Sequence, residues 1–205
     1  MPQPGLVSLR EALFEVPSGG ISFRNLQDFQ EIWSLATNFW VMYSRKRILK
    51  HGDTATTYAC RFEKNKKSST KNPQVPANKR RNTTIREPGQ CRVRIIVKIT
   101  SNNTVTVLRA QSSALQHTHS MEESDLLKRN DAIRDAIRRE ARNLDSSPGQ
   151  IELSIRETFE QVGAQFVNKV EIANIQRKER ERLGIQSLSP KVPDDPFIFH
   201  VPNYK

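Results

Sequence analysis

The chain of 205 residues contains no apolar run near the roughly 18 residues that a membrane-spanning helix needs. Its first seventeen residues are interrupted by Arg10, Glu11 and Glu15, so the pattern of a secretory signal is absent. Only 36% of the residues are hydrophobic, and the mean hydropathy is −0.65. These absences predict an intracellular protein with no membrane contact, in which a packed core occupies only part of the chain.

Cysteine is also scarce, since Cys60 and Cys91 are the only two. A reducing cell interior disfavours a disulfide between them. Aromatic residues make up only 7% of the chain. Trp40 and Tyr43 are the only candidates near the basic strand for stacking RNA bases, and core packing is the alternative for at least one of them.

Positive charge is abundant and unevenly placed. The segment from Tyr43 to Ala110 holds seventeen basic and three acidic residues, a net charge of +14, whereas the rest of the chain carries −3. A segment this one-sided predicts a polyanionic partner.

Composition divides the chain into successive parts. Residues 1–20 are expected to be a disordered leader ending at two glycines, and residues 21–121 a β-sheet domain with an initial helix. Within that domain, residues 64–88 contain three prolines and almost nothing apolar, which indicates a mobile basic loop. Residues 122–184 have a helical pattern, and the proline-rich residues 185–205 are expected to be a flexible tail.

Within the sheet domain, apolar spacings of three and four residues predict a helix over Asn25–Thr37. Four strands are expected to follow, with a tight turn at Asn102-Asn103; they cover Phe39–Leu49, Thr54–Glu63, Cys91–Thr100 and Thr104–Ala110. The third strand alternates, with Val93, Ile95, Val97 and Ile99 on one face and Arg92, Arg94 and Lys98 on the other. One face of the sheet is therefore predicted to be core and the other basic.

Three helices are predicted in the C-terminal part. The first begins with Ser124 as its N-cap and runs towards Asn143, its apolar side including Leu144. The second is capped by Ser147 with Pro148 in its first turn, and the third covers Asn168–Leu183. Their apolar stripes belong either to a core or to a homodimer interface.

The two cysteines and two of the four histidines form a candidate metal site. Cys60 lies in one predicted strand and Cys91 begins another, and His117 and His119 are two residues apart, so that in an extended segment their rings point the same way. Two thiolates and two imidazoles would complete a closed tetrahedral Zn²⁺ site that supports folding and has no position open for catalysis. The long spacing differs from that of an ordinary zinc finger, and two buried thiols beside a surface histidine pair are the alternative.

The order of these motifs resembles a known family. Phe39–Arg47 (FWVMYSRKR), Tyr58–Arg61 (YACR), Gln90–Arg94 (QCRVR) and His117–His119 (HTH) together resemble the zinc DNA-binding domain of the far-red-impaired-response type. Such domains have folds of the WRKY and glial-cells-missing kind, and occur at the N-terminus of Mutator-like transposases and of transcription factors derived from them. The resemblance covers roughly residues 21–121, and Phe166–Asn174 resembles the linker helix that precedes the transposase catalytic domain.

This resemblance implies an α+β fold: a small antiparallel, four- to five-stranded, zinc-bound, WRKY-like sheet with an N-terminal helix, followed by a helical segment. It implies a nuclear protein that binds double-stranded DNA sequence-specifically. The WRKYGQK signature with which plant WRKY factors read bases is absent from this chain. Only the position of that strand can be transferred, and this position points to Arg45, Lys46 and Arg47 as groove contacts. Arg92, Arg94 and Lys98 are candidate backbone contacts.

No catalytic residues and no small-molecule substrate are expected, because a transposase nuclease domain would need a long α/β region after the helices. Three functions remain open. The leading one is a transposase-derived transcription regulator or transposon-end-binding module. The others are the N-terminal fragment of a Mutator-like transposase, and a basic RNA- or protein-binding module with self-associating helices.

Overall fold

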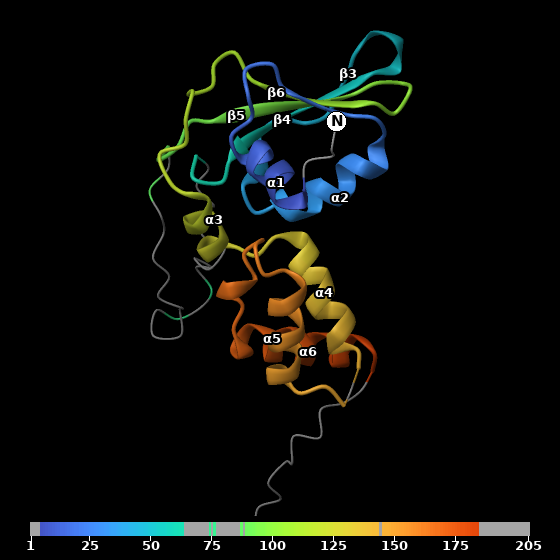
Figure 1. Cartoon of the computed structure of the whole chain (residues 1–205), viewed down its shortest axis with the longest axis vertical. Helices are drawn as coiled ribbons and strands as arrows, with labels where there is room; N and C mark the ends of the chain where they lie inside the picture. Colours follow the sequence, from blue (N-terminus) through green and yellow to red (C-terminus); the bar gives the residue numbers. More distant parts are fainter. Residues whose placement is uncertain are drawn as a thin grey trace, which may run out of the picture.

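The computed structural model describes residues 5–63, 89–143 and 145–184, together with positions 74, 76 and 87. It is an α+β protein with two stacked parts, a sheet unit and a helical unit (Figure 1). Most of the predicted loop 64–88, the tail 185–205 and Leu144 lie outside the described residues. Among the described residues, no helix combines the length and apolar content needed to cross a bilayer.

The sheet is antiparallel and has six strands, more than the four to five expected. Its order is β1-β6-β5-β4-β2, and β3 also pairs with β4. The strands are β1 (Ile21–Phe23), β2 (Trp40–Met42), β3 (Arg47–Ile48), β4 (Thr54–Cys60), β5 (Arg94–Ile99) and β6 (Val105–Arg109). A short 3-10 turn, η1 (Lys50–Gly52), joins β3 to β4.

Strands β5 and β6 form the predicted hairpin. Asn103 at its turn has a φ of 63°, a left-handed conformation that asparagine tolerates better than most residues. The predicted alternation along β5 is confirmed, because Val93, Ile95 and Val97 are buried whereas Lys98 is exposed.

The edge strand is interrupted, contrary to the single strand predicted over Phe39–Leu49. Met42 pairs with Tyr58 and Arg47 with Ala55, so four edge residues oppose two residues of β4. Such extra residues bend a strand and push it out of the ladder. The resulting edge bulge, residues 43–46, carries the exposed Arg45 and Lys46.

Helices α1 (Leu6–Phe14) and α2 (Leu26–Ala36) cover the buried face of the sheet (Figure 1). The prediction of a disordered leader is therefore wrong from Gly5 onward. Leu13, Phe14 and Val16 belong to the same core as Ile95 and Val107. A nine-residue helix is marginal by itself, and α1 is stabilised by this burial of its apolar side.

The helical unit has a core of its own, formed by α4 (Asp131–Ala141), α5 (Pro148–Thr158), the 3-10 turn η3 (Ala164–Phe166) and α6 (Lys169–Arg182). Ser147 caps α5 with Pro148 in the first turn, as predicted. Asn168, the first residue of the predicted third helix, is the N-cap of α6. The apolar stripes, including Ile137 and Ile155, are buried within the chain. The homodimer stays a prediction.

The first helix predicted here is in fact two. α3 (Met121–Leu127) is capped by Ser120, which forms a capping box with Glu123, and not by Ser124. A second start follows at Asn130, whose side chain accepts a hydrogen bond from the Ile133 amide and donates one to the carbonyl of Val162. These bonds cap the start of α4 and so separate it from α3.

Candidate metal centre

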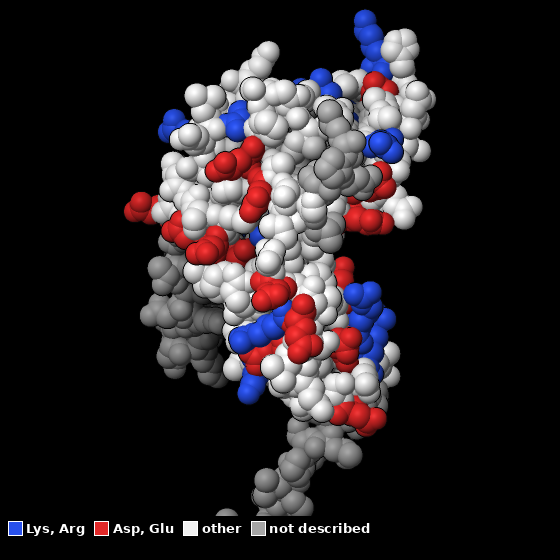
Figure 2. All heavy atoms as spheres, viewed as in Figure 1, with Lys and Arg blue, Asp and Glu red and all other residues white. Residues whose placement is uncertain are grey.

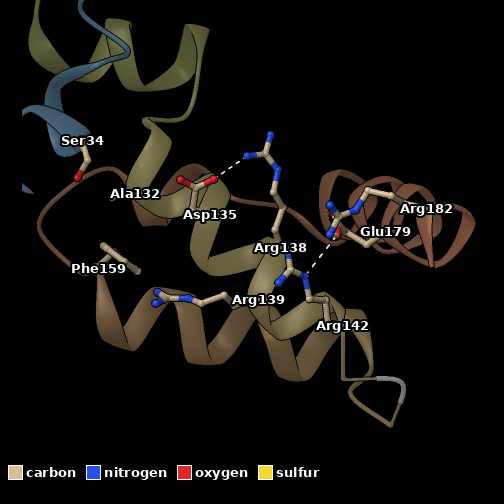
Figure 3. A pocket seen from close by; sticks show the side chains of 9 residues that line it. All are labelled: Ser34, Ala132, Asp135, Arg138, Arg139, Arg142, Phe159, Glu179 and Arg182. Carbon is tan, nitrogen blue, oxygen red and sulfur yellow. Dashed lines mark hydrogen bonds and ion pairs between the residues drawn. The ribbon is translucent and has the colours of Figure 1, made fainter. Parts of the chain in front are cut away.

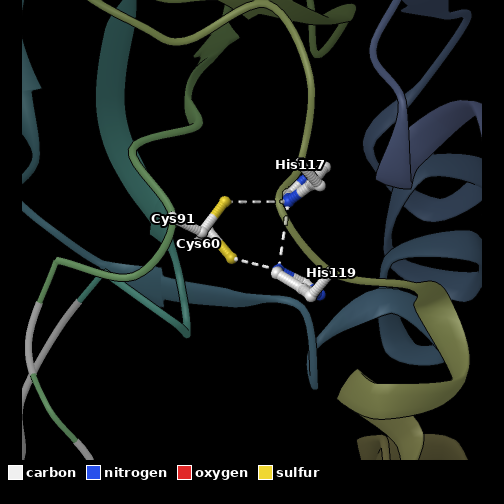
Figure 4. A group of neighbouring side chains, drawn as sticks. All are labelled: Cys60, Cys91, His117 and His119. Atoms are coloured by element: carbon white, nitrogen blue, oxygen red, sulfur yellow. Dashed lines mark hydrogen bonds between the residues drawn. The ribbon is translucent and has the colours of Figure 1, made fainter.

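Cys60, Cys91, His117 and His119 come together at one end of the sheet, as the sequence predicts (Figure 4). Cys60 ends β4, Cys91 precedes β5, and the two histidines lie between β6 and α3. Both cysteines are fully buried, and the histidines are half-buried. One ligand atom of each residue lies within 4.8 Å of the others, so these groups could hold one metal ion.

The spacing of the ligand atoms suits a tetrahedral ion. Cys60 Sγ is 3.0 Å from His119 Nε2, and Cys91 Sγ is 3.3 Å from His117 Nδ1. The two histidine nitrogens are also 3.3 Å apart. Bonds of about 2.0 to 2.3 Å arranged tetrahedrally place ligand atoms roughly 3.3 to 3.8 Å from one another.

Backbone hydrogen bonds orient the two histidines differently. Nε2 of His117 lies 2.9 Å from the carbonyl oxygen of Phe14, and Nδ1 of His119 lies 2.9 Å from the carbonyl oxygen of Ser120. A carbonyl only accepts, so each of these nitrogens carries the proton. The opposite nitrogens, Nδ1 of His117 and Nε2 of His119, are left with lone pairs that face the cysteines.

Local contacts fix the segments that carry the ligands. Thr118, between the two histidines, donates a hydrogen bond of 2.6 Å to the carbonyl of Gln90, which precedes Cys91. Arg61, directly after Cys60, donates to carbonyls at the end of α2, at 2.7 Å for Asn38 and 3.0 Å for Thr37. These contacts anchor the segments that carry the four residues to each other and to the end of α2.

Electrostatics at this cluster favour a thiolate. A hydrogen bond with the Cys60 thiol lowers the pKa of the Cys91 thiol far below its usual value, against burial, which raises it. A thiolate is the form in which cysteine binds a metal.

The predicted DNA contacts occupy the outer face and the edge of the sheet. Arg45, Lys46, Arg47, Arg92 and Lys98 are exposed. Figure 2 shows basic side chains along the sheet end of the molecule, with acidic side chains in a band beneath it, over α1 to α3.

Arg94 differs from the other candidates. Its guanidinium donates to both carboxylate oxygens of Glu63, and it lies 4.3 Å above the ring of Tyr43. These contacts raise the pKa of Arg94, foremost through the Glu63 hydrogen bond, and they neutralise its charge locally. Sequence reasoning missed this pair because its members are 31 residues apart, with no local pattern to connect them.

Apart from the Cys–His cluster, a concave region of the surface lies over α4, between α2, α5 and α6 (Figure 3). This open pocket of about 670 Å³ is lined in part by four arginines and two acids. Arg138 pairs with Asp135 at 2.5 Å, and Glu179 pairs with Arg182 at 3.0 Å and Arg142 at 3.5 Å. It is a weaker candidate for a site than the cluster of Cys60, Cys91, His117 and His119, which could hold a metal ion.

Comparison with models of protein families, with curated proteins and with solved structures finds no match to this chain.

Proposed function

We propose that the chain is a nuclear, zinc-stabilised protein that binds double-stranded DNA, of the far-red-impaired-response type. The observation that carries the proposal is the convergence of Cys60, Cys91, His117 and His119, from three separate segments, until one ligand atom of each lies within 4.8 Å of the others. Two sulfur and two nitrogen ligands are a donor set that zinc prefers. Four protein ligands leave no position for water, so the ion's role is to hold the fold.

The sheet supports DNA as the polyanion. Arg47 of β3 and Lys98 of β5 lie on the same face and in the same cross-strand row, with Ala55 between them. Two strand spacings separate them by roughly 10 Å, which suits contacts along one groove about 12 Å wide. The edge bulge brings Arg45 and Lys46 to the rim of this row, where they can reach base edges or phosphates.

Metal analysis of the full chain, purified without a polyhistidine tag, tests the zinc part. We expect one zinc per chain and loss of the native fold on chelation. The Cys60→Ser variant should bind zinc far more weakly, whereas Ser113→Ala, which changes a residue outside the ligand set, should bind it normally. A folded protein without zinc, or an unaffected Cys60→Ser variant, would contradict the proposal.

DNA selection with the zinc-loaded protein tests the second part. For about six neutralised phosphates, the logarithm of the affinity should fall with the logarithm of salt concentration at a slope near −5. Charge reversal of Arg45 and Arg47 should weaken binding and change sequence preference, whereas reversal of Arg156 on α5 is the matched control. Tighter binding to RNA than to any duplex DNA would favour the alternative of an RNA-binding module.

A further inference from the structure

Helix α1 reaches the metal centre directly. The ring of Phe14, the last residue of α1, is stacked on His117, with ring centroids 4.1 Å apart and planes at 11°. It also meets the edge of His119 at 5.6 Å. Phe14 therefore contacts His117 in two places. Its ring lies on the face of the imidazole, and its carbonyl accepts a hydrogen bond from Nε2 of His117.

The rest of α1 is tied to the elements on either side of the ligands. Arg10, only 1% exposed, donates to the carbonyl of Leu35 at 2.9 Å and to the carboxylate of Asp125 at 2.5 Å. Asp125 belongs to α3, which begins two residues after His119. The indole of Trp40 donates to the carbonyl of Leu13 at 3.1 Å. The helix that ends in Phe14 is therefore held in place by hydrogen bonds with Leu35, Asp125 and Trp40.

An outer partner of this kind fixes the tautomer and the angle of a metal-binding imidazole, and its loss typically weakens metal affinity by about 10- to 100-fold. We infer that α1 is a functional part of the metal centre: Phe14 is a positioning residue that holds His117 with Nδ1 free for the ion. This inference rests on the proposed zinc site. It follows that metal binding and the docking of α1 strengthen each other, because linked equilibria are reciprocal.

Zinc affinity, measured by competition with a chromophoric chelator, tests the inference in the full chain. Phe14→Ala removes the ring stacked on His117 and loosens the end of α1 that carries the accepting carbonyl, so it should lower the affinity by about 10-fold or more, and Phe14→Leu by less. Phe23→Ala is the matched control, because Phe23 lies in the same core but packs against Phe29. It should destabilise the fold and leave the affinity within about threefold of wild type.

A second measurement does not depend on a variant that folds. Nitrogen-15 NMR of the zinc-loaded wild type should show the proton of His117 on Nε2 and that of His119 on Nδ1, with the His117 proton protected from exchange. The opposite tautomer at His117, or wild-type affinity in folded Phe14→Ala, would overturn this inference alone. A wild type that binds no zinc would overturn the proposed function as well.

Discussion

Replacing Arg10 by methionine tests whether the buried pair between Arg10 and Asp125 joins the two parts of the protein. Both side chains are almost fully buried, at 1% and 5% exposure. Arg10→Met keeps the apolar stem but leaves the Asp125 carboxylate without its main partner. Breaking a buried pair in this way costs about 3 to 5 kcal/mol. Because Asn38 still donates to Asp125 at 2.7 Å, we expect a loss near the lower end, about 3 kcal/mol.

Urea unfolding followed by tryptophan fluorescence measures this loss, since Trp33 and Trp40 both lie in the sheet unit. The double variant Arg10→Met with Asp125→Leu is the control. It removes both charges, and should be more stable than Arg10→Met alone. A loss below about 1 kcal/mol for the single variant would refute the reasoning, because it would mean that Asp125 is not left as an uncompensated buried charge.

The same variant has a pH dependence whose sign follows from burial. Burial raises the pKa of Asp125, and the charge of Arg10 opposes that rise. Without Arg10 the pKa of Asp125 in the folded state rises further above its unfolded value. Protonation then favours the folded state at low pH, and this contribution is lost as pH rises through the folded pKa. The stability gap between variant and wild type should therefore be smaller at acid pH than at neutral pH, and a constant gap would contradict this.

Two further substitutions test other contacts. Gly163→Ala should lower stability by about 2 kcal/mol or more, because φ is 95° and a Cβ would lie 2.7 Å from the Asp125 carboxyl carbon; an unchanged melting temperature would contradict it. Glu63→Gln removes the acid that neutralises Arg94, so DNA affinity should rise and the salt slope should steepen by up to about 1. Fluorescence anisotropy at several salt concentrations measures this, and an unaltered slope would remove Arg94 from the proposed DNA face.

Local patterns were sufficient to predict the β5–β6 hairpin and the start of α5. Alternation of branched residues specifies which face of a strand is buried, and Ser147 followed by Pro148 specifies a helix start by local hydrogen bonding and a fixed φ. The metal-binding set could be identified because so few cysteines and histidines are present. Because Cys60 and Cys91 lie on predicted strands and His117 and His119 are two residues apart, few other sets of four ligands could be formed.

Long-range contacts explain what the sequence did not reveal. Helix α1 is short and lies between proline and glycine residues, and its order comes from Arg10 binding a residue 115 positions away. The edge bulge was hidden because strand-favouring residues lie on both sides of it, Trp40 and Val41 before it and Ile48 after it, and no glycine or proline marks the two extra residues. The break before Asn130 was missed because two capping residues, Ser120 and Asn130, outweigh an apolar pattern that continues past both.

The two cores imply that removal of the metal acts unequally on the protein. The ligands cross-link β4, the segment before β5 and the approach to α3, all in the sheet unit, whereas the helical core contains none of them. Zinc binding by small domains contributes about 10 to 16 kcal/mol, more than most domains have as net stability. Chelation should therefore change the tryptophan fluorescence of the sheet unit at a lower chelator concentration than it changes the larger part of the helical circular dichroism, which comes from α4, α5 and α6. Coincident transitions would show instead that contacts between the units, among them the Arg10–Asp125 pair and the hydrogen bond from the Asp131 amide to Thr37, make the two units unfold as one.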